Sequence, residues 1–227
     1  MNIKLLSIGG LSRAGKDTFV GIAKNILAKD GYKSLKIAFA DNLKREVQIM
    51  LRDNGFKIDI NNISAEEKER IRPLFVFWGN QRRRESEDGL YWIDIVDKKI
   101  NFICNDMNTD PDKFIFFISD IRYMNEAKWI KETWKGEFIH LKRYSIKELV
   151  FREHDVYEKK PTRVYDPAPN EEELKQDPII QEMADQKIEW ENKKKLTLAE
   201  AIEDPYLQNI VLKTLNKTKY FSGTLSL

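Results

Sequence analysis

A glycine-rich segment near the amino end constrains the fold more than any other feature of this 227-residue sequence. An apolar run at residues 3–8 predicts a short buried strand that ends in Gly9 and Gly10. The segment Gly10-Leu-Ser-Arg-Ala-Gly-Lys-Asp-Thr18 follows, and apolar side chains then recur at helical spacing over residues 17–29. This order of strand, loop and helix is typical of loops that bind phosphate groups through backbone N–H groups and a helix N-terminus.

Lys16 is the residue of this loop that we expect to reach the β- and γ-phosphates of a nucleotide. A Ser or Thr usually follows that lysine and binds Mg²⁺, but Asp17 stands there and Thr18 comes next. Either the Thr18 side chain binds Mg²⁺ in place of that residue, or Asp17 binds the ion through a water molecule. The candidate nucleotide-binding residues are Gly10, Ser12, Arg13, Ala14, Gly15, Lys16, Asp17 and Thr18.

A second acidic site follows the most apolar run of the chain. Residues 113–119 predict a central buried strand, and Asp120 comes directly after it. An acid in that place, beside a phosphate loop, holds Mg²⁺ or its waters in many nucleotide-binding proteins. Arg122 could bind a phosphoryl group in transfer, and a surface ion pair with Glu126 is the alternative. The predicted metal ligands are Thr18, Asp17 and Asp120, and the predicted catalytic residues are Lys16, Asp17, Asp120 and Arg122.

A basic stretch between the second and third predicted strands is the candidate acceptor site. Three consecutive arginines, residues 82–84, end a helix that begins near Arg72. Because adjacent residues on a helix point in different directions, only Arg82 or Arg83, together with Arg72, could clamp one phosphate. Pairing with the acids at 85–88 is the alternative.

Aromatic residues and one lysine complete the predicted acceptor site. Trp78 and Trp92 could stack on a base or belong to the core. Lys44 follows the second strand, and Arg143 ends a later one. The candidate acceptor-binding residues are therefore Lys44, Arg72, Trp78, Arg82, Arg83, Trp92 and Arg143. The two histidines, His140 and His154, show no partner spacing, and we assign neither a role.

The rest of the chain alternates between predicted strands and helices. A capping box at Ser64 and Glu67 starts one helix, and Pro73 predicts that two helices meet there. The charged stretch 145–185 holds four prolines and predicts a mobile surface excursion. Further strands are predicted at 34–40, 138–142 and 187–191, and further helices at 42–54, 74–84, 91–104, 126–135 and 205–215, with one more that Thr197 caps. The alternation predicts an α/β fold with a parallel sheet covered by helices on both faces.

Composition limits the partners and the compartment. The 39 basic and 37 acidic residues leave a net charge of +2, which gives no general attraction to nucleic acid or membranes. A single cysteine, Cys104, excludes an internal disulfide and suits a reducing compartment. No segment resembles a signal peptide or a membrane span. We therefore expect a cytoplasmic protein with no membrane partner; a homodimer stays open.

The phosphate loop resembles that of phage deoxynucleoside monophosphate kinases of the T-even type, and also that of animal phosphomevalonate kinases. The resemblance covers about residues 1–143 and resumes near 185. The family's usual Gly-Pro is replaced by Asp41-Asn42, and the region with Arg152, His154 and Arg163 departs most. The matching segments are 10–18, 40–44, 78–83, 91–92, Ser119-Asp-Ile-Arg122, 125–126, 138–143, 185–192 and 197–201.

The resemblance implies a P-loop kinase with a five-stranded parallel sheet in the order 2-3-1-4-5. It implies a single domain with a core at 1–41, 113–143 and 185–227, an acceptor-binding insertion at 42–112 and a lid-like excursion at 144–184. ATP and Mg²⁺ would be the co-substrates, and a deoxynucleoside 5′-monophosphate would be phosphorylated to the diphosphate. If the chain is phage-encoded, the host cytoplasm is the expected compartment.

Three alternatives to this acceptor stay open at the level of the sequence. Enzymes that phosphorylate hydroxymethylated pyrimidines in DNA resemble the same family, although the net charge of +2 does not favour a DNA substrate. Phosphomevalonate is another acceptor with the same motif set. A regulatory module that hydrolyses nucleoside triphosphates, with 145–185 contacting a partner protein, is the alternative outside the kinases.

Overall fold

The computed structural model describes residues 3–106, 110–153, 156–192 and 196–227. The chain divides into two compact units. The first, the sheet unit, comprises Met1–Lys36 and Pro111–Leu227, and the second, the insertion unit, comprises Ile37–Asp110. Among the described residues, no helix has the length and apolar character needed to cross a membrane.

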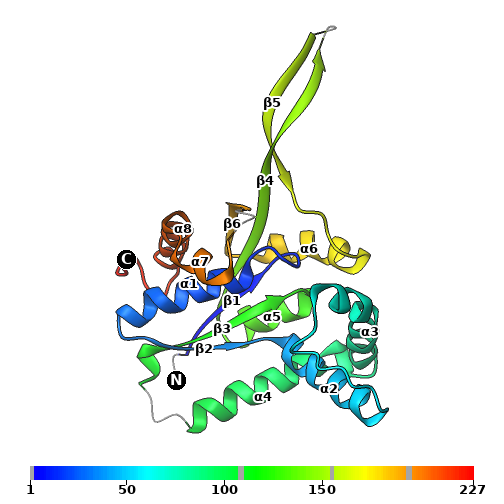
Figure 1. The fold of residues 1–227 in the computed structure, drawn as a ribbon. Coiled ribbons are helices and arrows are strands. Elements are labelled where there is room, and N and C mark those ends of the chain that lie inside the picture. Colours follow the sequence, from blue (N-terminus) through cyan, green and yellow to red (C-terminus); the bar gives the residue numbers. More distant parts are fainter. Residues whose placement is uncertain (1–2, 107–109, 154–155, 193–195) are drawn as a thin grey trace. The chain divides into compact units, whose positions relative to one another are not determined.

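A mixed sheet of six strands, shown in Figure 1, has the order β2-β3-β1-β4-β5, with β6 also paired to β4. The pairs β1–β3, β1–β4 and β4–β6 are parallel, whereas β4 and β5 are antiparallel. The predicted order 2-3-1-4-5 is confirmed when β6 is counted as the fifth strand. The strands are β1 Lys4–Gly9, β2 Lys33–Ile37, β3 Phe114–Ile121, β4 Glu137–Glu153, β5 Val156–Tyr165 and β6 Gln186–Glu191.

The register of the strands brings the ends of β1 and β3 to the same edge of the sheet, beside His140 of β4. Gly9, the last residue of β1, lies opposite Ile121 on one neighbour and His140 on the other. The loop after β1 and the residues around Asp120 therefore meet at the carboxyl edge. In open α/β sheets this edge is where ligands bind.

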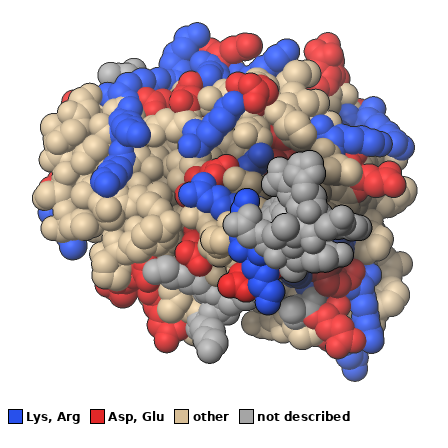
Figure 2. All heavy atoms as spheres, turned by 90° about the horizontal axis from the view of Figure 1, so that it is seen from above, with Lys and Arg blue, Asp and Glu red and all other residues tan. Residues whose placement is uncertain are grey.

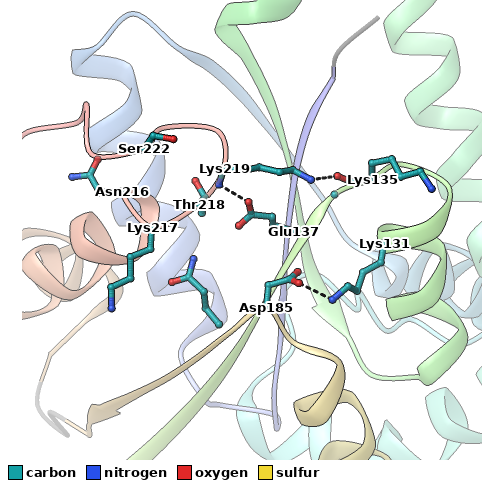
Figure 3. Close-up of a pocket in the computed structure, with 11 residues that line it drawn as sticks. Lys131, Lys135, Glu137, Asp185, Asn216, Lys217, Thr218, Lys219 and Ser222 are labelled. Atoms are coloured by element: carbon teal, nitrogen blue, oxygen red, sulfur yellow. Dashed lines mark hydrogen bonds and ion pairs between the residues drawn. The ribbon is translucent and has the colours of Figure 1, made fainter.

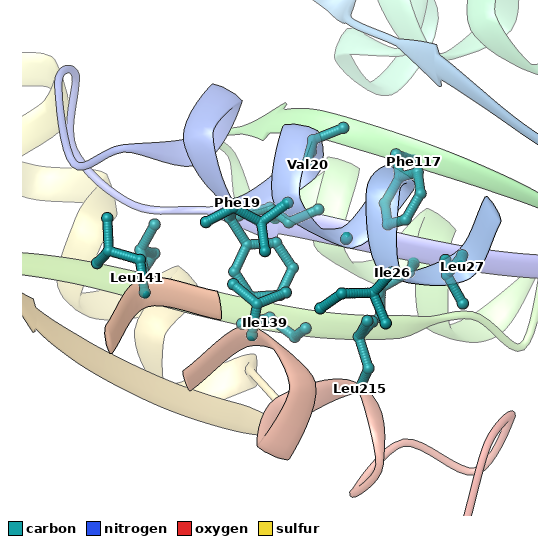
Figure 4. Close-up of a cluster of buried hydrophobic side chains, with 14 of the residues drawn as sticks. Phe19, Val20, Ile26, Leu27, Phe117, Ile139, Leu141 and Leu215 are labelled. Carbon is teal, nitrogen blue, oxygen red and sulfur yellow. The ribbon is translucent and has the colours of Figure 1, made fainter. Parts of the chain in front are cut away.

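The helices of the sheet unit bury both faces of the sheet. Helix α1, Lys16–Lys29, turns Phe19 and Ile26 toward Ile139 of β4, and Leu215 of α8 completes the cluster (Figure 4). Burying a side chain of this size contributes about 1.5–3 kcal/mol, so this cluster holds the loop before α1 to the sheet. The remaining helices are α5 Met124–Glu132, α6 Glu171–Met183, α7 Leu198–Glu203 and α8 Pro205–Leu215.

The insertion unit is helical, and one prediction about it was wrong. The predicted break at Pro73 is absent, and α3 runs unbroken from Ala65 to Arg84. Its side chains on both sides of Pro73, including Ile71 and Leu74, pack on the buried cluster around Val47. That shared core outweighs the single helical hydrogen bond that a proline removes. The helices are α2 Phe39–Asp53, α3 Ala65–Arg84 and α4 Tyr91–Asp106, with a short 3-10 turn at Glu87–Gly89.

The stretch 145–185 was predicted as a mobile surface excursion, and most of its described residues lie in β4, β5 and α6. Strand β4 continues to Glu153, and from Tyr144, opposite Tyr165, onward it pairs with β5. Beyond Tyr144, β6 no longer accompanies β4, so the two strands project as a ribbon (Figure 1). Pro161 is compatible with β5 because β5 is an edge strand. On its outer side no further strand needs a backbone N–H, which proline lacks. Helix α6 follows.

Candidate active site at the phosphate loop

The loop between β1 and α1 needs glycine at two positions. Gly10 and Gly15 have φ angles of 120° and 96°, in the region that favours glycine. A Cβ atom on Gly10 would lie 2.2 Å from the carbonyl oxygen of Leu141, and one on Gly15 would lie 2.5 Å from the Trp190 ring. The loop is therefore packed directly against β4 and β6, which fixes its path.

Trp190 supports the loop and was not predicted. It lies on β6, is 2% exposed, and its indole Nε1–H donates to the carbonyl oxygen of Ala14 at 2.8 Å. Its ring also packs at an angle against Phe19 of α1, with 6.4 Å between the ring centroids. The last strand of the sheet thus holds both the loop and the start of the following helix.

The amino end of α1 presents backbone donors that its own helix does not use. The first four N–H groups of a helix have no partner within the helix, and here no side chain caps the Gly15 position. Together with the helix dipole, these donors form a site for an anion such as a phosphate. Lys16, Asp17 and Thr18 supply the first turn.

Lys16 lies folded back over its own loop. Its Nζ donates to the carbonyl oxygens of Gly10 and Leu11, each at 2.7 Å. Burial, and next the Arg122 guanidinium, lower the pKa of Lys16 to about 8, while Glu173, Asp120 and Asp17 act in the opposite direction. A buried ammonium that donates to neutral carbonyl oxygens, as Lys16 does here, gains strongly from an incoming anion.

Arg122 is held by a carboxylate that sequence reasoning missed. Its Nη1 pairs with Oε1 of Glu173, a residue of α6 that is 6% exposed. The other oxygen of Glu173 accepts from the backbone N–H of Ser12 in the loop, at 2.7 Å. Glu126, the partner in the alternative ion pair, is bonded to the backbone of Arg122, because the N–H of Arg122 donates to Glu126 Oε2 at 2.8 Å.

The predicted metal ligands differ in their surroundings. Asp17 is paired with Lys36 of β2, and its side chain is 68% exposed. Asp120 lies near the end of β3 and acts electrostatically on Lys16. Among the described residues there is no cluster of three or more carboxylate, His or Cys ligands. A Mg²⁺ ion at a phosphate loop needs only one or two protein ligands besides substrate phosphates and water, so Thr18 and Asp120 fit this ion.

In the insertion unit, two predicted acceptor residues belong to a polar network around Glu46 of α2. Trp78 Nε1 and Arg82 Nε donate to Glu46 Oε2 at 2.8 and 2.9 Å, and the Tyr91 hydroxyl donates to Oε1. The Arg82 guanidinium also lies over the Trp78 and Tyr91 rings, at 5.0 and 4.8 Å. Burial acts to raise the pKa of Glu46, but these hydrogen bonds hold it below its ordinary value.

The other predicted acceptor residues lie in several parts of the two units. Arg72 is paired through two nitrogens with Glu69, at 2.8 Å each, and Arg143 is paired with Asp166 of the sheet unit. Trp92 is 2% exposed and donates to the Gly79 carbonyl oxygen at 3.1 Å, which makes it a core residue and corrects its expected stacking role. Lys44 is half-buried on α2, Arg83 lies in the last turn of α3, and His154 is outside the described residues.

A pocket of about 570 Å³ lies at the opposite edge of the sheet. It opens where β4 and β6 begin, at Glu137 and Gln186, and Figure 3 shows the side chains of Asp185 and Lys131 turned toward each other. Lys131 is paired with Asp185, and the backbone N–H of Lys219 donates to Glu137. These internal pairs, and the distance of one strand length from the loop, separate this pocket from the phosphate site.

Sequence reasoning missed the contacts that come from β6 and α6. Glu173 and Asp177 lie in the stretch that was predicted as a mobile surface excursion, yet Asn170 and Glu173 have the spacing of a helix N-cap. The Asn170 side chain does accept from the Glu173 N–H, at 2.8 Å. That signal could have located α6, but not its carboxylate at the loop.

The chain matches no protein-family model and no curated protein sequence. It is similar to the unliganded crystal structure of a sugar kinase from Janibacter sp. HTCC2649, with a TM-score of 0.39 and 10% sequence identity, over 94% of this chain and 93% of that one. A likeness at this level carries no argument about activity, so the function is inferred from the site itself.

Proposed function

We propose that this chain is a P-loop kinase that transfers the γ-phosphoryl group of ATP to a deoxynucleoside 5′-monophosphate. One observation carries the proposal: Lys16, Arg122 and the open first turn of α1 converge on one loop at the carboxyl edge of the sheet. Cationic groups and backbone N–H groups of this kind bind polyphosphate and stabilise charge during phosphoryl transfer.

The transfer itself requires no covalent intermediate on the protein. An oxygen of the acceptor forms a bond to the γ-phosphorus, the bond from that phosphorus to the β–γ bridging oxygen breaks, and ADP leaves. Lys16 would exchange the two loop carbonyls for phosphate oxygens, and Arg122 would offset charge on the transferring group. The N–H groups at the start of α1 would fix the remaining phosphate oxygens.

Thr18 and Asp120 are the residues that would hold Mg²⁺ in this proposal. The ion, when bound with the nucleotide, supplies neutralisation of charge on the β- and γ-phosphates. Asp17 is the weaker candidate because its carboxylate is already paired with Lys36.

The acceptor is the finer part of the proposal. The resemblance of the loop and of the segment Ser119–Arg122 to phage deoxynucleoside monophosphate kinases supports a nucleotide acceptor. The ribbon formed by β4 and β5 continues from the strand next to the loop, which supports its proposed role as a lid that excludes water.

A second acceptor class is favoured by one observation. Arg72 and Arg82, which were expected to bind an acceptor phosphate, are both paired with carboxylates of their own unit. An acceptor hydroxyl, such as that of a hydroxymethylated pyrimidine in DNA, would not need to displace those carboxylates. Against DNA, basic and acidic side chains are interspersed on the face shown in Figure 2, among the residues that are coloured there.

The test is ATP consumption with Mg²⁺ across the four common deoxynucleoside monophosphates, 5-hydroxymethyl-dUMP, phosphomevalonate and DNA that contains 5-hydroxymethyluracil. Turnover on a free deoxynucleotide supports the proposal and names the acceptor. Turnover only on DNA moves the protein to the second class. ATP hydrolysis that needs no acceptor contradicts both.

A further inference from the structure

Glu173 is a buried residue whose carboxylate contacts Arg122, the phosphate loop and the Asn170 side chain. Its Oε1 pairs with Arg122 and accepts from Asn170 Nδ2 at 3.3 Å, and its Oε2 accepts from the Ser12 N–H at 2.7 Å. Burying an ionised carboxylate is costly unless it is paired and hydrogen-bonded. This carboxylate meets that condition only while Arg122 and the loop are in these positions.

The position of Glu173 leaves the anion site open. It uses the N–H of Ser12, in the first half of the loop, while the N–H groups of the first turn of α1 begin at Gly15 and Lys16. A phosphate could therefore occupy the helix N-terminus with Glu173 still in place. In this arrangement the carboxylate orients Arg122 toward the loop and does not compete for the main phosphate donors.

A second contact of α6 with the sheet makes it possible to distinguish two roles of Glu173: positioning Arg122, or only holding the helix in place. Asp177 lies one turn after Glu173, on the same face of α6, and pairs with Nε2 of His140 at 2.9 Å. His140 is 1% exposed and lies on β4. Asp177 thus holds α6 to the sheet through a contact that involves neither Arg122 nor the loop, which makes it a matched control.

We propose that Glu173 is a positioning residue for phosphoryl transfer, which fixes the Arg122 guanidinium beside the phosphate loop. The role rests on the proposed kinase function. The Arg122 side chain is 37% exposed, and without a partner such a long side chain would sample many rotamers. A fixed guanidinium avoids that loss of freedom at the moment of transfer, which is a source of rate acceleration.

The first test compares Glu173→Gln with Asp177→Asn in the full chain. We expect Glu173→Gln to lower kcat at least about 10-fold with KM for ATP changed by less than about 3-fold. Asp177→Asn should lower the melting temperature and leave kcat within about 2-fold of the parent. If both variants lost kcat and melting temperature equally, Glu173 would only hold α6 to the rest of the unit, and the proposal would be wrong. Tighter ATP binding by Glu173→Gln, with kcat retained, would also overturn the proposal.

A double-mutant cycle tests whether Glu173 acts through Arg122. The variant Arg122→Ala should lose activity, and adding Glu173→Gln should cost less than about 2-fold more, because the partner is already gone. Multiplicative losses would show that Glu173 acts independently of Arg122, which the proposal does not allow.

A spectroscopic test separates this inference from the kinase function. The Nε–H signal of Arg122, assigned from its absence in Arg122→Ala, should be sharp in the parent protein and in Asp177→Asn. It should broaden or vanish in Glu173→Asp, whose shorter side chain keeps the charge and should preserve the fold. A sharp signal in Glu173→Asp would contradict the positioning role even if the parent proves to be an active kinase. If the parent transfers no phosphate at all, the kinase proposal fails while this measurement still tests the pairing.

Discussion

Two arginine–carboxylate pairs, one in each unit, show how similar chemistry can serve different ends. In the sheet unit, Arg122 pairs with Glu173 beside a loop whose helix N-terminus has open backbone donors. In the insertion unit, Arg82 pairs with Glu46, which also accepts from Trp78 and Tyr91. The first pair lies next to a helix N-terminus whose N–H groups could bind an anion. In the second pair, the Glu46 carboxylate accepts hydrogen bonds from three donors of its own unit.

The difference explains why the arginines of α3 could not be judged from the sequence. Adjacent basic residues indicate a phosphate site only where their charge is not already balanced, and Glu46 lies 36 positions before Arg82. Lys16 and Arg122 are also close to each other, and their mutual repulsion contributes to the lowered pKa of Lys16. The loop therefore combines a buried ammonium group with the backbone N–H groups of a helix N-terminus, whereas Arg82 of the insertion unit is paired with Glu46; the following experiments test this contrast.

The largest effect is expected at Lys16. Lys16→Ala removes the only ammonium group that is bonded to the loop carbonyls in the described structure, and we expect phosphoryl transfer to fall by about 1,000-fold or more. The far-ultraviolet circular dichroism spectrum should stay unchanged. Lys29→Ala, at the exposed end of the same helix, is the matched control and should retain full activity. Near-normal transfer by Lys16→Ala would remove the loop from the mechanism.

Gly10→Ala should break the loop by sterics alone. The added Cβ would lie 2.2 Å from a backbone oxygen at a φ of 120°, and together the clash and strain should cost about 3 kcal/mol. Gly31→Ala is the control: its φ is 77°, but nothing lies within 4 Å of the new Cβ, so about 1 kcal/mol is expected. Urea titration of both variants measures the difference, and equal costs would show that the loop does not pack against β4.

The pKa of Lys16 predicts a pH dependence of stability. Its pKa is lowered to about 8 from 10.5, so between these values the unfolded chain binds more protons than the folded one. Stability from this group therefore rises as pH increases from about 8 to about 10.5. Relative to Lys16→Met, the free energy of unfolding of the parent should increase by about 2–3 kcal/mol over this range, at about 1.4 kcal/mol per pKa unit. A constant difference between the two proteins would show that Lys16 is not buried.

Glu46→Ala should give a smaller effect, within the insertion unit. It leaves three donors without their acceptor, at a cost of about 2 kcal/mol near neutral pH. Because the pKa of Glu46 is lowered, this contribution is present above its ordinary pKa and is lost as the pH falls through the folded value. Hydrogen exchange should report faster opening of residues 39–53 and 65–84.

Glu69→Ala provides the comparison for Glu46. Glu69 pairs with Arg72 on one helix and is 46% exposed, so less than about 0.5 kcal/mol is expected. If the two variants open the insertion unit equally, the network around Glu46 has no special role there.

The sequence by itself determined the parts of this protein in which local chemistry and burial agree. Gly10 and Gly15 are dictated by the loop geometry, the apolar strands at 3–8 and 113–119 are buried on both faces, and the capping boxes at Ser64 and Thr197 start helices as predicted. The glycines and the capping boxes depend on residues a few positions apart, which is why the strand–loop–helix context of the P-loop could be predicted from the residues. The strand order was instead implied by the resemblance to phage deoxynucleoside monophosphate kinases.

Only the tertiary structure decided which distant groups meet at the site. Trp190 reaches Ala14 across 176 positions, and Glu173 reaches Ser12 across 161, and no local pattern encodes such pairs. Pro73, Pro161 and Pro178 lie inside helices or strands because packing on a shared core, or a place on an edge strand, can offset one missing hydrogen bond. Pro167 and Pro169, by contrast, do lie between β5 and α6. The local sequence therefore determines the loop and helix N-terminus at which we propose that a phosphate binds, whereas long-range packing determines which carboxylates and aromatic rings hold the residues around them.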